Sequence, residues 1–298
     1  MSQTWENKFS NWTNPPSDTE ENKLSNAEQM IKDAIADYPS LANKNIEIFG
    51  QGSYANNTNV RLNSDIDICV RLMDTFYYDL PDDMTKEDFN IGPGTNTYSD
   101  FKNDVEAAMV KKFGRSDVDR GNKAITIAGN SYRVEADVVP TFEQRRYNKN
   151  KAYLSGTQFY PDNGGVVKNW PKQHIENGIN KNKNTQRRFK RTVRIFKKLR
   201  YEMKDEGYSI CDKVPSFLIE CLVWNIPNST LNASNSWYER IKQCVIFLYN
   251  ATETDEKCSE WGEVSELLYL FKGHSKWTRQ DANDFILQAW NYIGYNND

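Results

Sequence analysis

Histidine and cysteine are scarce in this chain of 298 residues. It has two histidines and five cysteines, and no two cysteines show the C-x-x-C spacing of many metal and redox sites. An odd number of cysteines gives no basis for a disulfide framework, so we expect free thiols in the reducing cytoplasm. No apolar run approaches the ~18 residues of a membrane span and no signal peptide is recognisable. We therefore expect no membrane association.

An excess of charge of one sign is also absent. The formal net charge is −3, whereas proteins that coat nucleic acids are usually basic. Long RNA or DNA is therefore not an expected partner. Residues 181–204 nevertheless contain eleven Lys or Arg and one acidic residue, a local charge of +10. Such a strip can steer a polyanion to one place, although most of its charges are expected to face solvent.

The chain has enough apolar surface for a folded core, with 38% hydrophobic and 13% aromatic residues. Apolar periodicity predicts an α+β lobe, residues 1–160, that precedes a helical lobe, residues 161–298. Predicted strands of the first lobe are 46–49, 65–72, 124–128 and 132–139. Predicted helices are 17–38, starting at Ser17, then 54–57, 100–113, 185–204, 215–225, 236–250, 261–271 and 281–292. Residues 74–98 and the Asn-rich residues 177–184 are interpreted as loops.

Two aspartates in an apolar segment carry the strongest chemical signal. Asp65 and Asp67 are separated by one residue, and residues i and i+2 of a strand point to the same face. Two adjacent carboxylates repel each other unless a cation lies between them, and Mg²⁺ prefers carboxylate and phosphate oxygens. An isolated Asp-x-Asp pair more often lies on a solvent-exposed strand face. The surrounding sequence must therefore show whether this pair binds a metal.

A turn that suits phosphate precedes this pair. Gly52 and Ser53 follow the predicted strand 46–49 closely and offer backbone N–H groups and a hydroxyl. Gln51 is a further candidate for contact with a triphosphate or a base. The order of strand, Gly-Ser turn, short helix and Asp-x-Asp strand indicates nucleotidyl transfer, which needs both a phosphate cradle and metal-binding carboxylates.

A third carboxylate comes from the predicted strand 132–139. Glu135 and Asp137 share one face of this strand, and Asp137 has the more apolar flank. If the strand neighbours strand 65–72, Asp137 lies beside the aspartate pair. We therefore predict that Asp65, Asp67 and Asp137 hold two Mg²⁺ ions, with Mn²⁺ as a substitute, and that Asp137 activates the attacking hydroxyl. Glu135 is the alternative to Asp137.

These residues resemble the signature of the polymerase-β-like nucleotidyltransferase superfamily. The segment GSYANNTNVRLNSDIDI and the helix before it are more narrowly similar to the bacterial cGAS/DncV-like nucleotidyltransferases, a resemblance that covers about residues 16–227. It implies a two-lobed enzyme with a mixed sheet, flanking helices and a helical second lobe. It also implies that the enzyme joins and cyclises ATP, GTP, UTP or CTP into a cyclic di- or trinucleotide messenger of anti-phage (CBASS-type) signalling, with release of pyrophosphate.

The resemblance also implies roles for residues of the second lobe. Lys197 matches a lysine that contacts the donor phosphates, and Ser216 matches a serine on the terminal phosphates. Phe217 stands where the family has a Tyr that stacks on the base, and Phe keeps the stacking face without the hydroxyl. His174 is interpreted as structural, with contact to the incoming nucleotide as the alternative. With only His174 and His274 in the chain, a zinc site like that of cyclic GMP–AMP synthase is unsupported.

Other functions remain as alternatives from the sequence. An RNA-tailing enzyme would need a longer basic track, and transfer to a small molecule usually occurs in shorter chains without this second lobe. The Asn-rich residues 177–184 have a second interpretation, as part of an acceptor base pocket. A pure binding module would have lost at least one carboxylate, and all three are present. We expect a monomer, with regulation by a partner protein left open.

Overall fold

The structure is a computed structural model that describes residues 2–15, 18–60, 65–273 and 276–297. It divides into two compact units, which we call the helical unit and the sheet unit. The helical unit comprises Met1–Pro15, Asn56–Val60 and Gln173–Asp298, and the sheet unit comprises Pro16–Ala55 and Arg61–Lys172. The predicted helix start at Ser17 lies outside the described residues.

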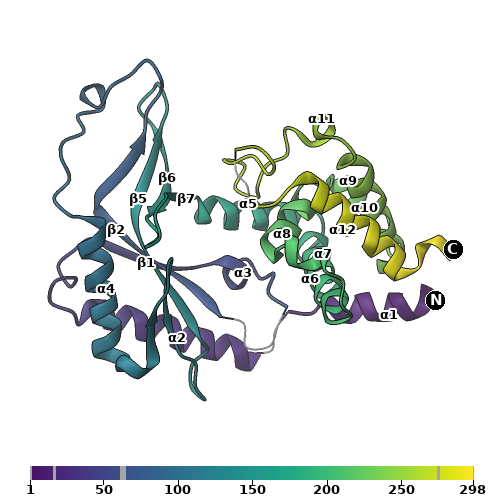
Figure 1. Ribbon diagram of the computed structural model, residues 1–298, viewed down its shortest axis with the longest axis horizontal. Coiled ribbons are helices and arrows are strands. Elements are labelled where there is room, and N and C mark those ends of the chain that lie inside the picture. Colours follow the sequence, from purple (N-terminus) through teal and green to yellow (C-terminus); the bar gives the residue numbers. More distant parts are fainter. Residues whose placement is uncertain (1, 16–17, 61–64, 274–275, 298) are drawn as a thin grey trace. The chain divides into compact units, whose positions relative to one another are not determined.

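The described part of the sheet unit is built on one seven-stranded mixed sheet (Figure 1). The strands are β1 (Ile46–Gln51), β2 (Ile66–Asp79), β3 (Val118–Arg120), β4 (Ile125–Ile127), β5 (Ala136–Tyr147), β6 (Tyr153–Phe159) and β7 (Val167–Asn169). The order is β1-β2-β5-β4-β3, while β6 pairs with the second half of β5 and β7 pairs with β6. Strands β2 and β5 are parallel, and the other pairs are antiparallel.

Alternation along β2 and β5 separates the two faces of this sheet. Ile68, Val70 and Val138 are almost fully buried and share a core with the apolar sides of α2 (Asp18–Ala36) and α4 (Tyr98–Phe113). Since successive side chains of a strand point to opposite faces, the aspartates that alternate with these residues point away from that core. The short elements of the unit are α3 (Gly52–Ala55), η1 (Glu87–Phe89) and η2 (Arg115–Asp117).

The helical unit has an apolar core of its own. Its elements are α1 (Ser2–Trp12), α5 (Pro171–Asn184), α6 (Arg188–Asp205), α7 (Ile210–Lys213), α8 (Ser216–Trp224), α9 (Asn228–Leu231), α10 (Trp237–Ala251), α11 (Asp255–Cys258), α12 (Arg279–Ile293) and η3 (Tyr295–Asn297). The first two residues of α5 precede Gln173, where the last segment of the unit begins. Helix α1 joins this unit because Glu6 accepts hydrogen bonds from the backbone N–H groups of Trp237 (3.0 Å) and Tyr238 (2.7 Å) at the start of α10. No helix among the described residues is long and apolar enough to cross a membrane.

Several sequence predictions need correction. The predicted helix 261–271 is wrong: this stretch forms turns and a single bridge between Gly262 and Tyr269, and Glu266 has a left-handed φ of 59° that a helix does not accommodate. The loop predicted for residues 74–98 is wrong at its start, because β2 continues to Asp79. The loop predicted for residues 177–184 lies within helix α5. The predicted lobes also differ from the compact units, which join residues 1–15 and 56–60 to the helical part and divide the chain after Lys172.

Candidate functional site

The centre of the candidate site is a pair of aspartates on neighbouring strands. Asp67 on β2 lies directly beside Asp137 on the parallel strand β5, and beside Gln51 on the antiparallel strand β1. Thr126, opposite Asp137 on β4, donates a hydrogen bond of 2.7 Å to Oδ1 of Asp137. The structure thus brings Asp67 and Asp137 together as the sequence predicts, while their chemical role stays a prediction.

The aspartate pair is electrostatically strained. Burial raises the pKa of Asp67 to about 6, and the negative charges of Asp137 and Asp65 add to this effect. No ion pair to Asp67 or Asp137 occurs among the described residues. A divalent cation would relieve such repulsion, and oxygen ligands are those that Mg²⁺ prefers. The pair therefore fits the predicted metal, although within the described ranges no three His, Cys, Asp or Glu side chains already gather as a ligand set.

The remaining acids lie at the edge of this pair. Asp65 directly precedes β2 and is exposed, and it is near enough for its charge to act on Asp67. Glu135, the alternative to Asp137, directly precedes β5 and is also exposed, and its carbonyl accepts a hydrogen bond of 3.0 Å from the N–H of Ile66. Residues 61–64 of the signature segment lie outside the described residues.

The Gly-Ser turn packs directly against one carboxylate. Gly52 has a φ of +69°, and a Cβ atom at this position would lie 2.0 Å from Oδ2 of Asp67. Only glycine meets both conditions, because it lacks a Cβ atom and adopts positive φ easily. Ser53 follows in the short helix α3 and is half-buried. The predicted phosphate turn and the predicted metal-binding carboxylate are therefore neighbours in space.

In the helical unit, Ser216 and Phe217 begin helix α8 after Pro215, which takes an extended N-cap conformation. The hydroxyl of Ser216 lies 3.2 Å from the hydroxyl of Tyr201 on α6. Backbone N–H groups in the first turn of a helix favour an anion. The ring of Phe217 is 38% exposed and its centroid lies 5.8 Å from the ring of His174. Phe217 thus offers an exposed aromatic edge beside an anion-friendly helix start.

Two consecutive lysines on α6 have opposite surroundings. Lys197, the predicted phosphate ligand, is 2% exposed and donates to Glu220 (2.8 Å) and Thr58 (3.0 Å). Lys198 is half-buried and forms no ion pair within the described ranges. Burial lowers the pKa of Lys198, and the positive charge of Arg194 lowers it further. The family resemblance selected Lys197, because helical spacing alone does not tell which of two adjacent lysines turns inward.

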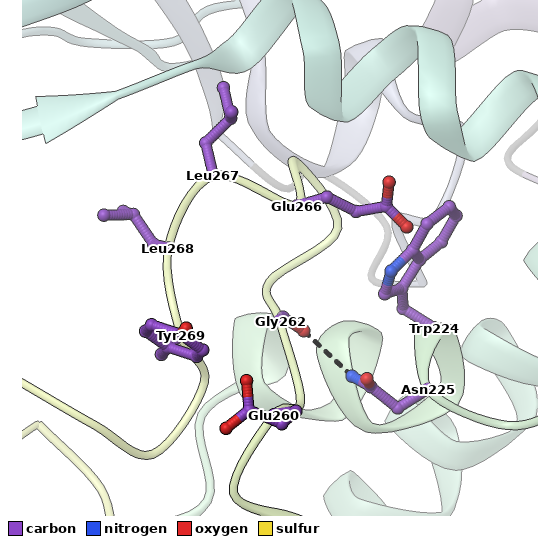
Figure 2. Close-up of a pocket in the computed structure, with 8 residues that line it drawn as sticks. All are labelled: Trp224, Asn225, Glu260, Gly262, Glu266, Leu267, Leu268 and Tyr269. Atoms are coloured by element: carbon purple, nitrogen blue, oxygen red, sulfur yellow. Dashed lines mark hydrogen bonds between the residues drawn. The ribbon is translucent and has the colours of Figure 1, made fainter.

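A separate pocket of about 270 Å³ lies in the helical unit, between the end of α8 and loop residues 262–269 (Figure 2). Its two aromatic rings, Trp224 and Tyr269, each already have a lysine of the same chain nearby. Lys181 lies 4.9 Å from the centroid of Trp224, and Lys272 lies 4.6 Å from that of Tyr269. None of the predicted site residues lines this pocket, and His274 lies outside the described residues.

Comparison with known proteins agrees with this geometry. Residues 176–294 match the family model of the cGAS/DncV-like nucleotidyltransferase C-terminal helical domain. The chain is 54% identical to the cyclic dipyrimidine nucleotide synthase CdnE of Cecembia lonarensis, over 99% of this chain and 100% of that protein. It is 42% identical to the protein of the same name from Legionella pneumophila, again over 99% and 100%.

A solved structure supports the same relationship. The CdnE cyclic dinucleotide synthase of Elizabethkingia meningoseptica, solved with GTP and Apcpp, matches with a TM-score of 0.82 and 36% identity, covering 97% of this chain and 99% of the other. The chain therefore belongs to the bacterial cGAS/DncV-like nucleotidyltransferases. The predicted α+β nucleotidyltransferase fold and the predicted enzyme class are confirmed.

Proposed function

We propose that this chain joins two pyrimidine nucleoside triphosphates and closes them into a cyclic dinucleotide. The observation that carries the reaction is the pairing of Asp67 and Asp137 in register, with Gly52 packed against the carboxylate of Asp67. The choice of pyrimidines rests on two relatives, 54% and 42% identical, whose name is cyclic dipyrimidine nucleotide synthase. The relative solved with GTP and Apcpp is more distant at 36% identity.

The aspartates would hold the metal. Asp65, Asp67 and Asp137 are the proposed ligands of two Mg²⁺ ions, or of Mn²⁺. Bound there, such ions supply neutralisation of charge on the phosphates and a more acidic attacking hydroxyl. Thr126 keeps the carboxylate of Asp137 in one orientation through its 2.7 Å hydrogen bond. With that orientation fixed, Asp137 is placed to accept the proton of the attacking ribose hydroxyl.

The other residues would hold the donor nucleotide. Ser53 and the turn around Gly52 contact phosphate oxygens, with Gln51 as their neighbour, and Ser216 contacts the terminal phosphates. Phe217 stacks on the donor base, which its exposed ring permits. For the basic contact we propose Lys197, which is paired with Glu220 in this structure, together with its neighbour Lys198, which is half-buried without an acidic partner among the described residues.

We propose the cellular role that the family resemblance implies. A cyclic dinucleotide made from cytosolic triphosphates would act as a second messenger of anti-phage defence in the cytoplasm. We propose that the enzyme is a monomer and that a partner protein regulates it.

The experiment is incubation of the purified protein with Mg²⁺ and each labelled triphosphate, alone and in pairs, followed by phosphatase. We expect pyrophosphate release and a phosphatase-resistant cyclic product with UTP, CTP or both. The Asp65→Ala, Asp67→Ala double variant should be inactive. Pyrophosphate release unchanged in that variant would rule out the proposed site, and a product made from purines alone would rule out the proposed base preference.

A further inference from the structure

Four polar side chains form a closed network inside the helical unit. Glu220 on α8 accepts hydrogen bonds from Lys197 on α6 (2.8 Å) and from the hydroxyl of Thr58 (2.7 Å), and its other oxygen lies 3.0 Å from Nε2 of His174 on α5. Lys197 also donates to the Thr58 hydroxyl (3.0 Å). None of the four residues is more than 8% exposed. We call Thr58, His174, Lys197 and Glu220 the buried anchor.

The charges of the buried anchor compensate one another. Burial by itself would raise the pKa of Glu220, but the charge of Lys197 and the hydrogen bonds from His174 and Lys197 outweigh it and hold this pKa far below its usual range. Glu220 is therefore ionised at neutral pH. A buried carboxylate with an ammonium partner is stable only while both remain. Lys197 is thus committed to Glu220 and is not a free surface cation.

The anchor holds a particular piece of chain. Thr58 belongs to the segment Asn56–Val60, which packs into the helical unit although the residues on both sides of it belong to the sheet unit. The neighbouring Asn57 has a left-handed φ of 52°, and its carbonyl accepts a hydrogen bond of 2.6 Å from Arg194 on α6. The segment begins directly after Ala55, the last residue of α3. The chain that leaves the Gly-Ser turn is therefore fixed within a few residues.

The residues of the buried anchor lie close, in the chain or in space, to Ser216, Phe217 and Ser53, which are predicted nucleotide contacts. Glu220 lies four residues after Ser216 on α8, about one helical turn, and the ring of His174 lies 5.8 Å from that of Phe217. On the other side, Ser53 is five residues before Thr58, a tether of at most roughly 17 Å even when fully extended. One buried network thus connects, through the chain, to both groups of residues that the proposed function assigns to the donor.

We propose that the buried anchor is a positioning device for nucleotidyl transfer. The inference rests on the proposed function. In this proposal, Thr58 fixes the chain that follows the Gly-Ser turn, and its hydrogen bond to Glu220 ties that chain to α8. Lys197 supplies the positive charge that stabilises the buried carboxylate of Glu220.

The test compares two isosteric variants that each remove one buried hydroxyl. Thr58→Val breaks the anchor and keeps its charges. Thr252→Val is the matched control, because Thr252 is also fully buried and donates to the carbonyl of Leu248 (2.7 Å) at the end of α10, outside the anchor. We expect Thr58→Val to lower kcat by roughly tenfold, with the KM for triphosphate within about twofold, because a misplaced group costs rate more than binding. Thr252→Val should have the kcat of the unchanged protein, and so should Thr58→Ser, which keeps the hydroxyl.

A readout independent of catalysis separates this inference from the proposed function. Hydrogen–deuterium exchange in the peptide that covers residues 50–60 should accelerate in Thr58→Val and not in Thr252→Val, even if no triphosphate is a substrate. Unchanged exchange and unchanged kcat in Thr58→Val would overturn the anchor. Equal loss of kcat in both Val variants would show that the anchor contributes only to overall stability, and this would overturn its positioning role.

Discussion

The two units of this chain bury charge in opposite ways. In the sheet unit, Asp67 and Asp137 place two like charges side by side without a described basic partner. In the helical unit, Glu220 is more completely buried, yet Lys197 and His174 surround its carboxylate. The aspartate pair is unfavourable until a cation binds between the carboxylates, whereas the charge of Glu220 is already compensated by groups of the same unit. A buried charge without a partner indicates a ligand site, and a buried charge with a partner indicates a structural role.

The largest effect is expected from neutralising one of the like charges. Asp137→Asn and Asp67→Asn should each lower pyrophosphate release by more than about a thousandfold, because metal-based charge stabilisation contributes several kcal/mol. Asp119→Asn is the control, since Asp119 is an exposed aspartate on β3 of the same sheet. Activity that survives in the Asp67 variant would show that the unmet charge has no part in the reaction.

The next largest effect concerns the matched charges. Glu220→Ala leaves the ammonium of Lys197 buried without a partner, and such losses typically cost about 3–5 kcal/mol of unfolding free energy. Adding Lys197→Met to this variant should restore part of the loss, because the uncompensated charge is then gone. Urea unfolding of both single variants and the double variant measures this coupling. Strictly additive losses would contradict the description of the two groups as a pair.

The comparison also predicts a pH dependence for the metal-free protein. Since the pKa of Asp67 is raised to about 6, ionisation of this group opposes folding, and stability should fall as the pH rises from about 4 to about 6. Asp67→Asn removes this penalty. It should therefore stabilise the protein at pH 8 by up to about 3 kcal/mol and have no effect near pH 4. Thermal unfolding at both pH values, in the presence of a chelator, measures the difference, and a destabilised Asn variant at pH 8 would contradict it.

A smaller effect is expected from the turn that touches this pair. In Gly52→Ala the new Cβ atom would meet Oδ2 of Asp67 at 2.0 Å, so the carboxylate has to move. Gly114→Ala is the matched control, because Gly114 also has a positive φ, +86°, but open space around its missing Cβ. Both variants should lose about 1 kcal/mol of stability, and only Gly52→Ala should lose activity, by roughly tenfold to a hundredfold. Equal activity of the two variants would show that the turn does not position Asp67.

The part of the sheet unit that carries the aspartates was predictable because its signals are local, whereas β3, β6 and β7 were not predicted. Alternation of apolar residues with aspartates specified the first half of β2. The same pattern around Asp137 specified only the start of β5, because the predicted strand 132–139 ends eight residues before Tyr147. Adjacent placement of these two strands followed from the need to gather carboxylates. The extension of β2 to Asp79 was missed since polar and aromatic residues there break the apolar pattern, although pairing with β5 continues.

The helical unit was harder to predict because its decisive contacts are distant in the sequence. No local pattern reveals that Thr58 binds Glu220, 162 residues later. For the same reason Lys197 and Lys198 were indistinguishable, and the family resemblance selected the one that the structure buries. Helix 261–271 was predicted from apolar spacing alone, and the backbone at Glu266 overrides that spacing.

The capping of α10 by Glu6 has a consequence for how the protein is made. Glu6 and Trp237 are 231 residues apart, so α1 meets this partner only after the long stretch of chain between them has been synthesised. Contacts of such separation slow folding, and domains usually fold as they emerge. Here the sheet unit can fold first, while the helical unit waits for the last helices. A nascent chain would therefore carry its aspartates before the helical unit is complete.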